Sequence, residues 1–537
     1  MTGTAHLPTH LHGKNLIGFA RSADGQKKFH AYNPREGREL DPAFYEATAE
    51  EVNRALDLAA QAAIEMRMLE AARIAEFLAN IGEELLAAGD ALIEAADRET
   101  ALGIDRLRGE RDRTVNQLKL FAGLASEGSW VDARIDPPLP DRKPLPRPDI
   151  RRMLQPIGPV AVFGASNFPL AFSVAGGDTA SAFAARNPVI VKAHPAHPAT
   201  SEIAGEAIRR AAQATRMPEG TFSLLHSLGT ETSIALATNP AIRAIAFTGS
   251  LRAGRALFDA AARRPDPIPV FAEMGSVNPV VLLPGVLENG THNIAEGLYR
   301  SVLLGVGQFC TSPGLVFGLA SGNLDKFTDR LSTLFSEGSP GTMLNPAICR
   351  SFAEKFKAAS ALGGVSVKVS ARQPDAKRTE GQPGLLLADA PTWLKSEELH
   401  EEIFGPSTLV VRCSNSSELA KCAEQLEGSL TATIHGTPEE LARNRELIEI
   451  LSRKAGRLIF NGFPTGVEVG YAMHHGGPYP ATTDEKFTSV GAAAIYRFAR
   501  PVCYQNFPEQ LLPPELQDAN PRRIWRMVNG QLTRDSL

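Results

Sequence analysis

The sequence has few cysteines, and none of them forms a recognisable pair. The five are odd in number, widely scattered and without a CxxC spacing, so they predict neither a disulfide framework nor a common zinc motif. They are Cys310, Cys349, Cys413, Cys422 and Cys503. We therefore expect free thiols and a protein of the reducing cytoplasm.

Long apolar runs and charge of one sign are also missing. Residues 1–25 carry His, Pro, Lys and Asp without a continuous apolar core, so we expect neither a signal peptide nor an anchor there. No later segment has the roughly 18 consecutive apolar residues of a membrane helix. The 56 basic and 60 acidic residues give a formal net charge of −4. We expect no nucleic-acid partner and no membrane partner.

What is present is a large globular chain with α/β character. Its 537 residues correspond to about three to four domains. Beyond residue 150, short apolar runs alternate with helical patterns, and this alternation predicts parallel sheets covered by helices on both faces. The strand-like runs are 160–163, 189–191, 222–225, 242–247, 280–283, 315–319, 407–411 and 458–460. Before them, a capping box at Thr48 and Glu51 and apolar stripes predict a mostly helical first quarter.

Three residues stand out as candidates for chemistry. Cys310, in GQFCTSPG, lies in a glycine-rich and polar break, where a thiolate nucleophile would find backbone donors. Glu273, in FAEMGS, follows an apolar run, and burial there would raise the pKa of a general base. Asn167, in GASNFP, is either a helix cap or an amide donor to an oxyanion.

Other patterns are weaker. No GxGxxG follows a strand, but the turn FTGS opens a helix whose free N–H groups favour a phosphate, unless Ser250 is simply an N-cap. His194 and His197 flank Pro195, and the adjacent His474 and His475 would point to opposite faces of a strand. We therefore expect no metal site.

The order of the motifs is more specific than any one of them. It runs Asn167 in NFP, Lys192 in VIVKA, FTGS, Glu273, Cys310 in GQFCT, and Glu402 in EIFGP. In this order and spacing the chain resembles the aldehyde dehydrogenase superfamily over nearly its whole length. The segments EMGSVNP, GQFCTSPG, PTGVEV and HGGPYPAT are most similar to the branch that oxidises 2,5-dioxopentanoate, also called α-ketoglutarate semialdehyde.

This resemblance implies a mechanism. Cys310 would attack the aldehyde carbon, and the Asn167 amide and the Cys310 backbone N–H would hold the oxyanion. After hydride transfer to a nicotinamide, water activated by Glu273 would hydrolyse the thioester. The resemblance also implies a small-molecule aldehyde as substrate and a homo-oligomer, either a dimer or a tetramer.

The implied cofactor is NADP, with NAD possible. Lys192 and Glu402 would hold the two ribose regions, Gly249 and Ser250 the pyrophosphate, and Phe404 would pack near the nicotinamide. NAD-preferring members carry a glutamate where this chain has Pro195. Two like charges about 4 Å apart repel by about 4 kcal/mol at an effective dielectric of about 20. The absence of that glutamate would remove this repulsion and admit the 2′-phosphate of NADP. We therefore expect NADP to be used at least as well as NAD.

Two departures concern the loop after Glu273. Ser276 replaces the second glycine of the family's ELGG pattern, and Asn278 stands near the place of a common lysine. The resemblance further implies a Rossmann-like cofactor domain, an α/β catalytic domain and an oligomerisation arm. The expected divisions are 1–135 with 151–272 for the cofactor domain and its helical N-terminal region, 136–150 with 485–505 for the arm, 273–470 for the catalytic domain, and 506–537 for a C-terminal tail.

Three alternatives remain at this point. One is an NADP-linked long-chain (fatty) aldehyde dehydrogenase. Another is a cysteine hydrolase or acyltransferase, which needs a histidine beside Cys310 that the sequence does not identify. The third is a binding protein that retains the fold without catalysis. The joint presence of Cys310, Glu273 and Asn167 argues against this third alternative.

Overall fold

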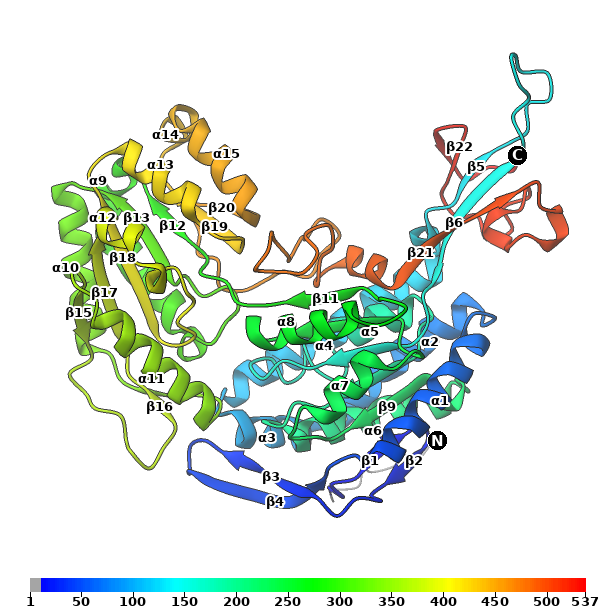
Figure 1. The fold of residues 1–537 in the computed structure, drawn as a ribbon, viewed down its shortest axis with the longest axis horizontal. Helices are drawn as coiled ribbons and strands as arrows, with labels where there is room; N and C mark the ends of the chain where they lie inside the picture. Colours follow the sequence, from blue (N-terminus) through cyan, green and yellow to red (C-terminus); the bar gives the residue numbers. More distant parts are fainter. Residues whose placement is uncertain (1–10) are drawn as a thin grey trace.

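The protein is described by a computed structural model covering residues 11–537. Two α/β bodies lie side by side, and an extended arm projects from one of them (Figure 1). Both bodies contain mostly parallel sheets, so the predicted α/β class is confirmed. The first ten residues of the segment expected to lack a leader lie outside the described residues.

The first body is built on a seven-stranded sheet in the order β11-β10-β7-β8-β9-β1-β2. Strands β7 to β11 are parallel, whereas β1 is antiparallel to β9 and to β2. The strands are β1 (Asn15–Ile17), β2 (Ala20–Ser22), β7 (Val160–Phe163), β8 (Val189–Lys192), β9 (Phe222–Leu225), β10 (Ala244–Thr248) and β11 (Val270–Glu273).

Helices cover both faces of this sheet. Alternate strand residues belong to two different cores: one includes α2 to α6, and the other includes α1 and α8. The helices are α1 (Ala49–Met66), α2 (Ala71–Ala87), α3 (Gly89–Thr100), α4 (Ile104–Glu127), α5 (Gly177–Ala184), α6 (Pro198–Ala214), α7 (Glu231–Thr238) and α8 (Leu251–Ala262). The predicted capping box of Thr48 and Glu51 starts α1.

The second body has a sheet of the same size, in the order β15-β17-β18-β13-β12-β19-β20. Its strands are parallel except for β15, which pairs antiparallel with β17. The strands are β12 (Val280–Leu282), β13 (Leu315–Leu319), β15 (Ser366–Val369), β17 (Gly384–Asp389), β18 (Ser407–Cys413), β19 (Ser429–His435) and β20 (Ala455–Phe460). Its helices are α9 (Pro284–Leu303), α10 (Gly322–Glu337), α11 (Pro346–Ser360), α12 (Ala390–Lys395), α13 (Ser416–Gln425), α14 (Pro438–Arg443) and α15 (Arg445–Lys454).

The arm is a five-stranded sheet assembled from distant parts of the chain. Its order is β21 (Ala499–Gln505), β6 (Ile150–Pro156), β5 (Arg134–Asp136), β22 (Arg526–Val528) and β23 (Gln531–Thr533). Strands from the expected C-terminal tail therefore belong to the same sheet as β6 and β21. Their three-residue length gives no apolar run that sequence patterns could detect. The expected domain divisions themselves stay a prediction.

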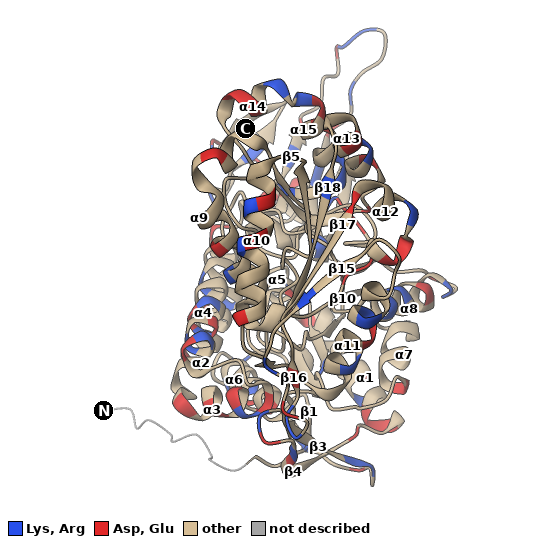
Figure 2. Ribbon diagram, turned by 90° about the vertical axis from the view of Figure 1, so that its left-hand side faces the viewer, with Lys and Arg blue, Asp and Glu red and all other residues tan. Residues whose placement is uncertain are grey.

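Residues 28–45 form a hairpin, so the helical region begins later than a mostly helical first quarter implies. Strands β3 (Lys28–Asn33) and β4 (Arg38–Tyr45) pair antiparallel, and Phe29 and Phe44 join a small buried cluster. The remaining short pair is β14 (Gly341–Thr342) with β16 (Glu380–Gly381). Within residues 11–537, no helix is both long and apolar enough to cross a membrane. Both signs of charge are spread over the helices (Figure 2).

Candidate active site

The sequence-predicted residues of the first body lie beyond the carboxyl ends of its parallel strands. Lys192 ends β8, and Glu273 ends β11. Gly249 and Ser250 follow β10 directly, and Asn167 lies in the segment after β7. This edge is where open α/β sheets bind ligands.

Cys310 lies in a loop whose backbone is unusually constrained. The three residues Gly305, Val306 and Gly307 all have positive φ values of 58°, 57° and 70°. The left-handed conformation is strained for a β-branched valine. A Cβ at Gly307 would lie 2.0 Å from the Gly405 carbonyl oxygen, so only glycine allows this loop to pack against the segment that follows Glu402.

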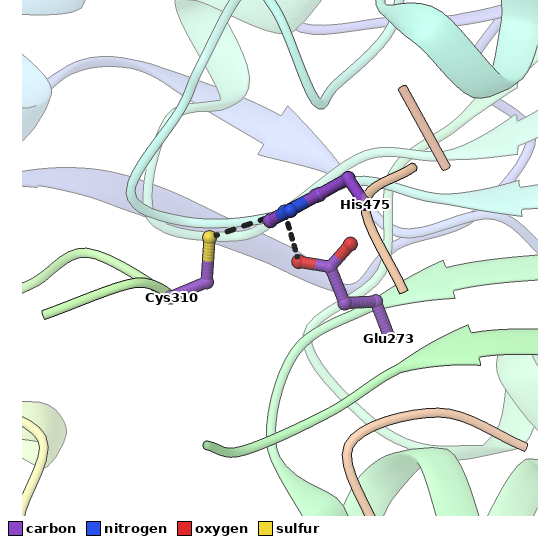
Figure 3. A group of neighbouring side chains, drawn as sticks. All are labelled: Glu273, Cys310 and His475. Atoms are coloured by element: carbon purple, nitrogen blue, oxygen red, sulfur yellow. Dashed lines mark hydrogen bonds and ion pairs between the residues drawn. The ribbon is translucent and has the colours of Figure 1, made fainter. Parts of the chain in front are cut away.

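Cys310, Glu273 and His475 form a compact group (Figure 3). The Cys310 Sγ lies 3.6 Å from His475 Nε2, which lies 3.1 Å from Glu273 Oε1. Ser489 donates to the other carboxylate oxygen, Oε2, at 2.5 Å. Sequence reasoning did not select His475, because it tested adjacent histidines only as metal ligands. The group is the one set of possible metal ligands found among residues 11–537, and our expectation of no metal stays a prediction.

Electrostatics divides the roles of the thiol and the carboxylate. Burial and the negative charge of Glu273 raise the pKa of Cys310 well above its usual value. From the sequence we expected burial to raise the pKa of Glu273. Burial does act in that direction, but His475 and Ser489 outweigh it, so the net pKa is lowered and the expectation of a raised pKa is wrong. At neutral pH the resting pair is therefore a thiol beside a carboxylate.

Asn167 is held next to the cysteine loop. Its buried side-chain amide donates to the Gln308 carbonyl at 2.9 Å. Its own backbone carbonyl accepts a 2.7 Å bond from Arg106, whose guanidinium lies over the rings of Phe168 and Phe309. The second N–H of the Asn167 amide is left for another acceptor.

Ser276 and Asn278, the two departures from the family pattern, form hydrogen bonds that hold the loop after Glu273 against the cysteine loop. Ser276 accepts from the Leu430 backbone N–H and donates to Asn278, both at 2.9 Å. Asn278 has a φ of 49° and donates to the carbonyls of Cys310 at 2.8 Å and Ser312 at 3.0 Å. The asparagine thus fixes the backbone of the candidate nucleophile, which the sequence did not predict.

The predicted cofactor residues occupy two places. Glu402 and Phe404 line a cleft together with Phe309 and Ser312, which flank Cys310. Burial raises the Glu402 pKa to about 7, and a Cβ at Gly275 would lie 2.6 Å from its Oε2. Glu402 therefore does not belong to a solvated acidic face.

The other cofactor candidates lie on the first sheet. Burial lowers the pKa of Lys192 to about 8, and Pro195 follows it in a half-buried turn. Ser250 does cap α8, accepting from the Ala253 N–H at 3.4 Å, and Gly249 precedes it. A buried cation and a capped helix start at one sheet edge fit a phosphate-bearing nucleotide.

The fold and the cysteine site agree with the family comparison. The model of the aldehyde dehydrogenase family matches residues 19–479, and the chain belongs to this family. It is an NAD(P)-dependent oxidoreductase that acts on an aldehyde.

Similar proteins are more specific. The chain is 48% identical to alpha-ketoglutaric semialdehyde dehydrogenase 2 of Azospirillum brasilense and 43% identical to the alpha-ketoglutaric semialdehyde dehydrogenase of Acinetobacter baylyi. Each comparison covers 97% of this chain and 99% of the relative. The solved structure of PnpE in complex with nicotinamide adenine dinucleotide superposes with a TM-score of 0.78, covering 92% of this chain and 97% of that one. Because the identity is only 20%, this likeness shows a shared fold and no more.

Proposed function

We propose that this protein oxidises α-ketoglutaric semialdehyde to 2-oxoglutarate with Cys310 as the nucleophile. The observation that carries the proposal is the Cys310–His475–Glu273 group in a chain that matches two relatives of that name over nearly their full length. Full-length similarity at these identities favours this substrate over a long-chain aldehyde.

The first step is attack of sulfur on the aldehyde carbon. The Cys310 proton passes to the neighbouring Glu273–His475 pair, whose atoms lie within hydrogen-bonding reach. The new C–S bond gives a thiohemiacetal oxyanion. The free N–H of the Asn167 amide and the Cys310 backbone N–H stabilise that charge.

The second half of the reaction releases the acid. A bound nicotinamide would supply the hydride acceptor for the substrate carbon. The proton received from Cys310 leaves the Glu273–His475 pair for solvent before hydrolysis, which restores the Glu273 carboxylate. A water then adds to the thioester while Glu273 takes its proton, and the C–S bond breaks to give the acid and the Cys310 thiolate, which regains a proton to restore the resting thiol. The buried His475 stabilises the negative charge on Glu273 between these steps. A cavity lined in part by Glu273, His475 and Ser489 offers room for that water.

NADP is the proposed preferred or equal cofactor. Pro195 carries no charge to repel a 2′-phosphate, and Lys192 lies at the end of β8 with a cationic ammonium. The ratio of kcat/KM for NADP and NAD tests this preference. A preference above about a hundredfold for NAD, more than about 2.7 kcal/mol, would contradict it.

We also propose a homo-oligomer, a dimer or a tetramer, joined through the arm. Strands β21 and β23 are the two edges of the five-stranded sheet, and such edges offer unpaired backbone groups to another chain. Sedimentation velocity at micromolar concentration measures the mass. A monomer would remove this proposal.

A substrate panel tests the main proposal. Reduced nicotinamide absorbance is followed with 2,5-dioxopentanoate, succinic semialdehyde, pentanal and a long-chain aldehyde, each with NAD and NADP. We expect the highest kcat/KM with 2,5-dioxopentanoate and no turnover in Cys310→Ala. Preference for the long chain would favour the fatty aldehyde alternative. The His475 contact with Cys310 also suits a hydrolase, so ester hydrolysis without dehydrogenase turnover would overturn the proposal.

A further inference from the structure

Arg113, on α4, lies close to the candidate site without an acidic partner. Its Cζ lies 5.1 Å from the centre of the Phe172 ring, and that ring lies 6.4 Å from the His475 imidazole. The guanidinium and the imidazole that contacts Cys310 therefore share Phe172 as a neighbour. Across the described part of the chain, no carboxylate lies within 4 Å of Arg113.

Arg457, on β20, approaches from the second body. Its Nη2 donates to the carbonyls of Pro464 at 2.9 Å and Gly466 at 3.2 Å. Its Nε is buried and has no hydrogen-bond partner among residues 11–537. Arg113 Nη2 donates to the carbonyl of Val467 at 3.3 Å, so both arginines hold the same turn, residues 464–467. This turn is the PTGV segment of the PTGVEV motif.

The two arginines are positively charged groups in half-buried positions. Burial lowers the pKa of Arg113, whereas negative charge on Glu110, Cys310, Glu468 and Glu273 raises it. Burial likewise lowers the pKa of Arg457, and negative charge on Cys310 raises it. Both side chains stay cationic, because arginine does not lose its proton in proteins. Two half-buried, unpaired cations are costly unless a ligand uses them.

We propose that Arg113 and Arg457 form an anion subsite that receives the carboxylate of the semialdehyde while its aldehyde carbon reaches Cys310. This inference rests on the proposed function. Each guanidinium has five N–H donors and spends few of them on the turn, which leaves donors for a carboxylate. The substrate class is therefore an ω-carboxylated aldehyde.

Three nearby carboxylates oppose this subsite. Two of them already have partners: Glu110 accepts from the backbone N–H groups of Leu170 and Ala171, and Glu273 contacts His475 and Ser489. The third is Glu468. It lies on the same motif, its side chain is exposed, and it is outside ion-pair distance of Arg113. Solvent screens an exposed carboxylate more strongly than a buried substrate carboxylate. Substrate therefore competes effectively for the guanidinium.

The experiment compares charged and uncharged substrates in matched variants. Arg113→Met and Arg457→Met are assayed with 2,5-dioxopentanoate, succinic semialdehyde and pentanal. Arg108→Met is the control, because Arg108 lies on the same helix, is exposed and pairs with Asp90. We expect each test variant to lose about 30-fold in kcat/KM for both semialdehydes, mainly through KM, which corresponds to one charge-assisted hydrogen bond. Pentanal should change less than about threefold.

The outcomes separate this inference from the proposed function. Equal loss with pentanal would mean that the arginines only hold the turn, and unchanged KM for both semialdehydes would also overturn the subsite. Arg113→Lys should restore part of the affinity for the semialdehydes, because it keeps the positive charge. Such a rescue would show that the loss in Arg113→Met does not come from misfolding. A wild type that prefers succinic semialdehyde, with the same dependence on arginine, would contradict the proposed substrate and leave the subsite intact.

Discussion

At the scale of single residues, the His475 imidazole links the Cys310 thiol to the Glu273 carboxylate. It contacts both the thiol and the carboxylate through one nitrogen, Nε2, and its Nδ1 is buried without a hydrogen-bond partner among the described residues. Because one N–H cannot serve two partners equally, a proton shared by these three groups has more than one available position. This is the property that alternating acid and base steps require.

Replacing this imidazole should move the pH dependence of turnover. In His475→Gln, the effect of burial on Glu273 is less opposed, so the pKa of this carboxyl should rise. A carboxylate whose pKa is lowered in the folded protein stabilises the fold at pH values above its ordinary pKa, and this stabilisation is lost as pH falls through the lowered pKa. Activity that needs the ionised carboxylate is lost over the same pH range. The acidic limb of the kcat profile should therefore move to higher pH.

The neighbouring His474 supplies the control for this measurement. It is half-buried and makes no hydrogen bond to Glu273. His474→Gln should leave the acidic limb in place. An unmoved limb in His475→Gln would show that the imidazole does not act on Glu273.

Prediction from sequence worked unevenly for the individual residues. Cys310 and Glu273 were selected from their motifs, and their side chains do meet in one group. His475 was missed because its contact with Cys310 spans 165 residues, which no local pattern reports. Asn278 was noted only as a departure, since its role depends on a left-handed backbone that bends its amide toward the cysteine loop.

Among the structural elements, the loop between β11 and β12 controls the approach of Glu402. Gly275→Ala should displace that carboxylate, because the new Cβ would lie 2.6 Å from Oε2. The displaced group is the end of a flexible side chain, so the fold should lose little stability. We expect KM for NAD(P) to rise about tenfold, as after loss of one good hydrogen bond.

The control for Gly275→Ala is another glycine with open space around it. A Cβ at Gly322, in α10, meets nothing within 4 Å, so Gly322→Ala should leave KM unchanged. Thermal unfolding of both variants checks their stability. A normal cofactor KM in Gly275→Ala would remove Glu402 from the proposed cofactor site.

Sequence patterns predicted the central elements better than the peripheral ones. The apolar runs at 160–163 and 222–225 match β7 and β9 to the residue, because strands buried on both faces are continuous apolar segments. The β3–β4 hairpin was missed because β4 buries only Leu40 and Phe44, and β22 was missed because it is short. Much of the stability of such strands comes from contacts with other parts of the chain, so the composition of the strands alone does not predict them.

At the scale of the whole molecule, three of the last thirty residues, Leu512, Leu516 and Ile524, belong to the core. Ile524 is fully buried and joins the cluster that contains α2 to α6. Ile524→Ala should therefore cost about 2–5 kcal/mol of unfolding free energy. Leu532→Ala, at a side chain that is 64% exposed, should stay within about 0.5 kcal/mol.

Chemical denaturation with urea measures both variants. Equal midpoints would contradict the packing of the C-terminal segment. A loss of oligomer without loss of stability would place Ile524 at an interface between subunits instead.

The parallel pairing of β22 with β5 has a consequence for how the protein is made. Met527 pairs beside Arg134, so the arm sheet needs a strand that follows its β5 partner by almost four hundred residues. The synthesis of both α/β bodies is completed between these two strands, and both can fold before the sheet closes, because domains generally fold as units during synthesis. A chain truncated before β22 cannot complete the sheet.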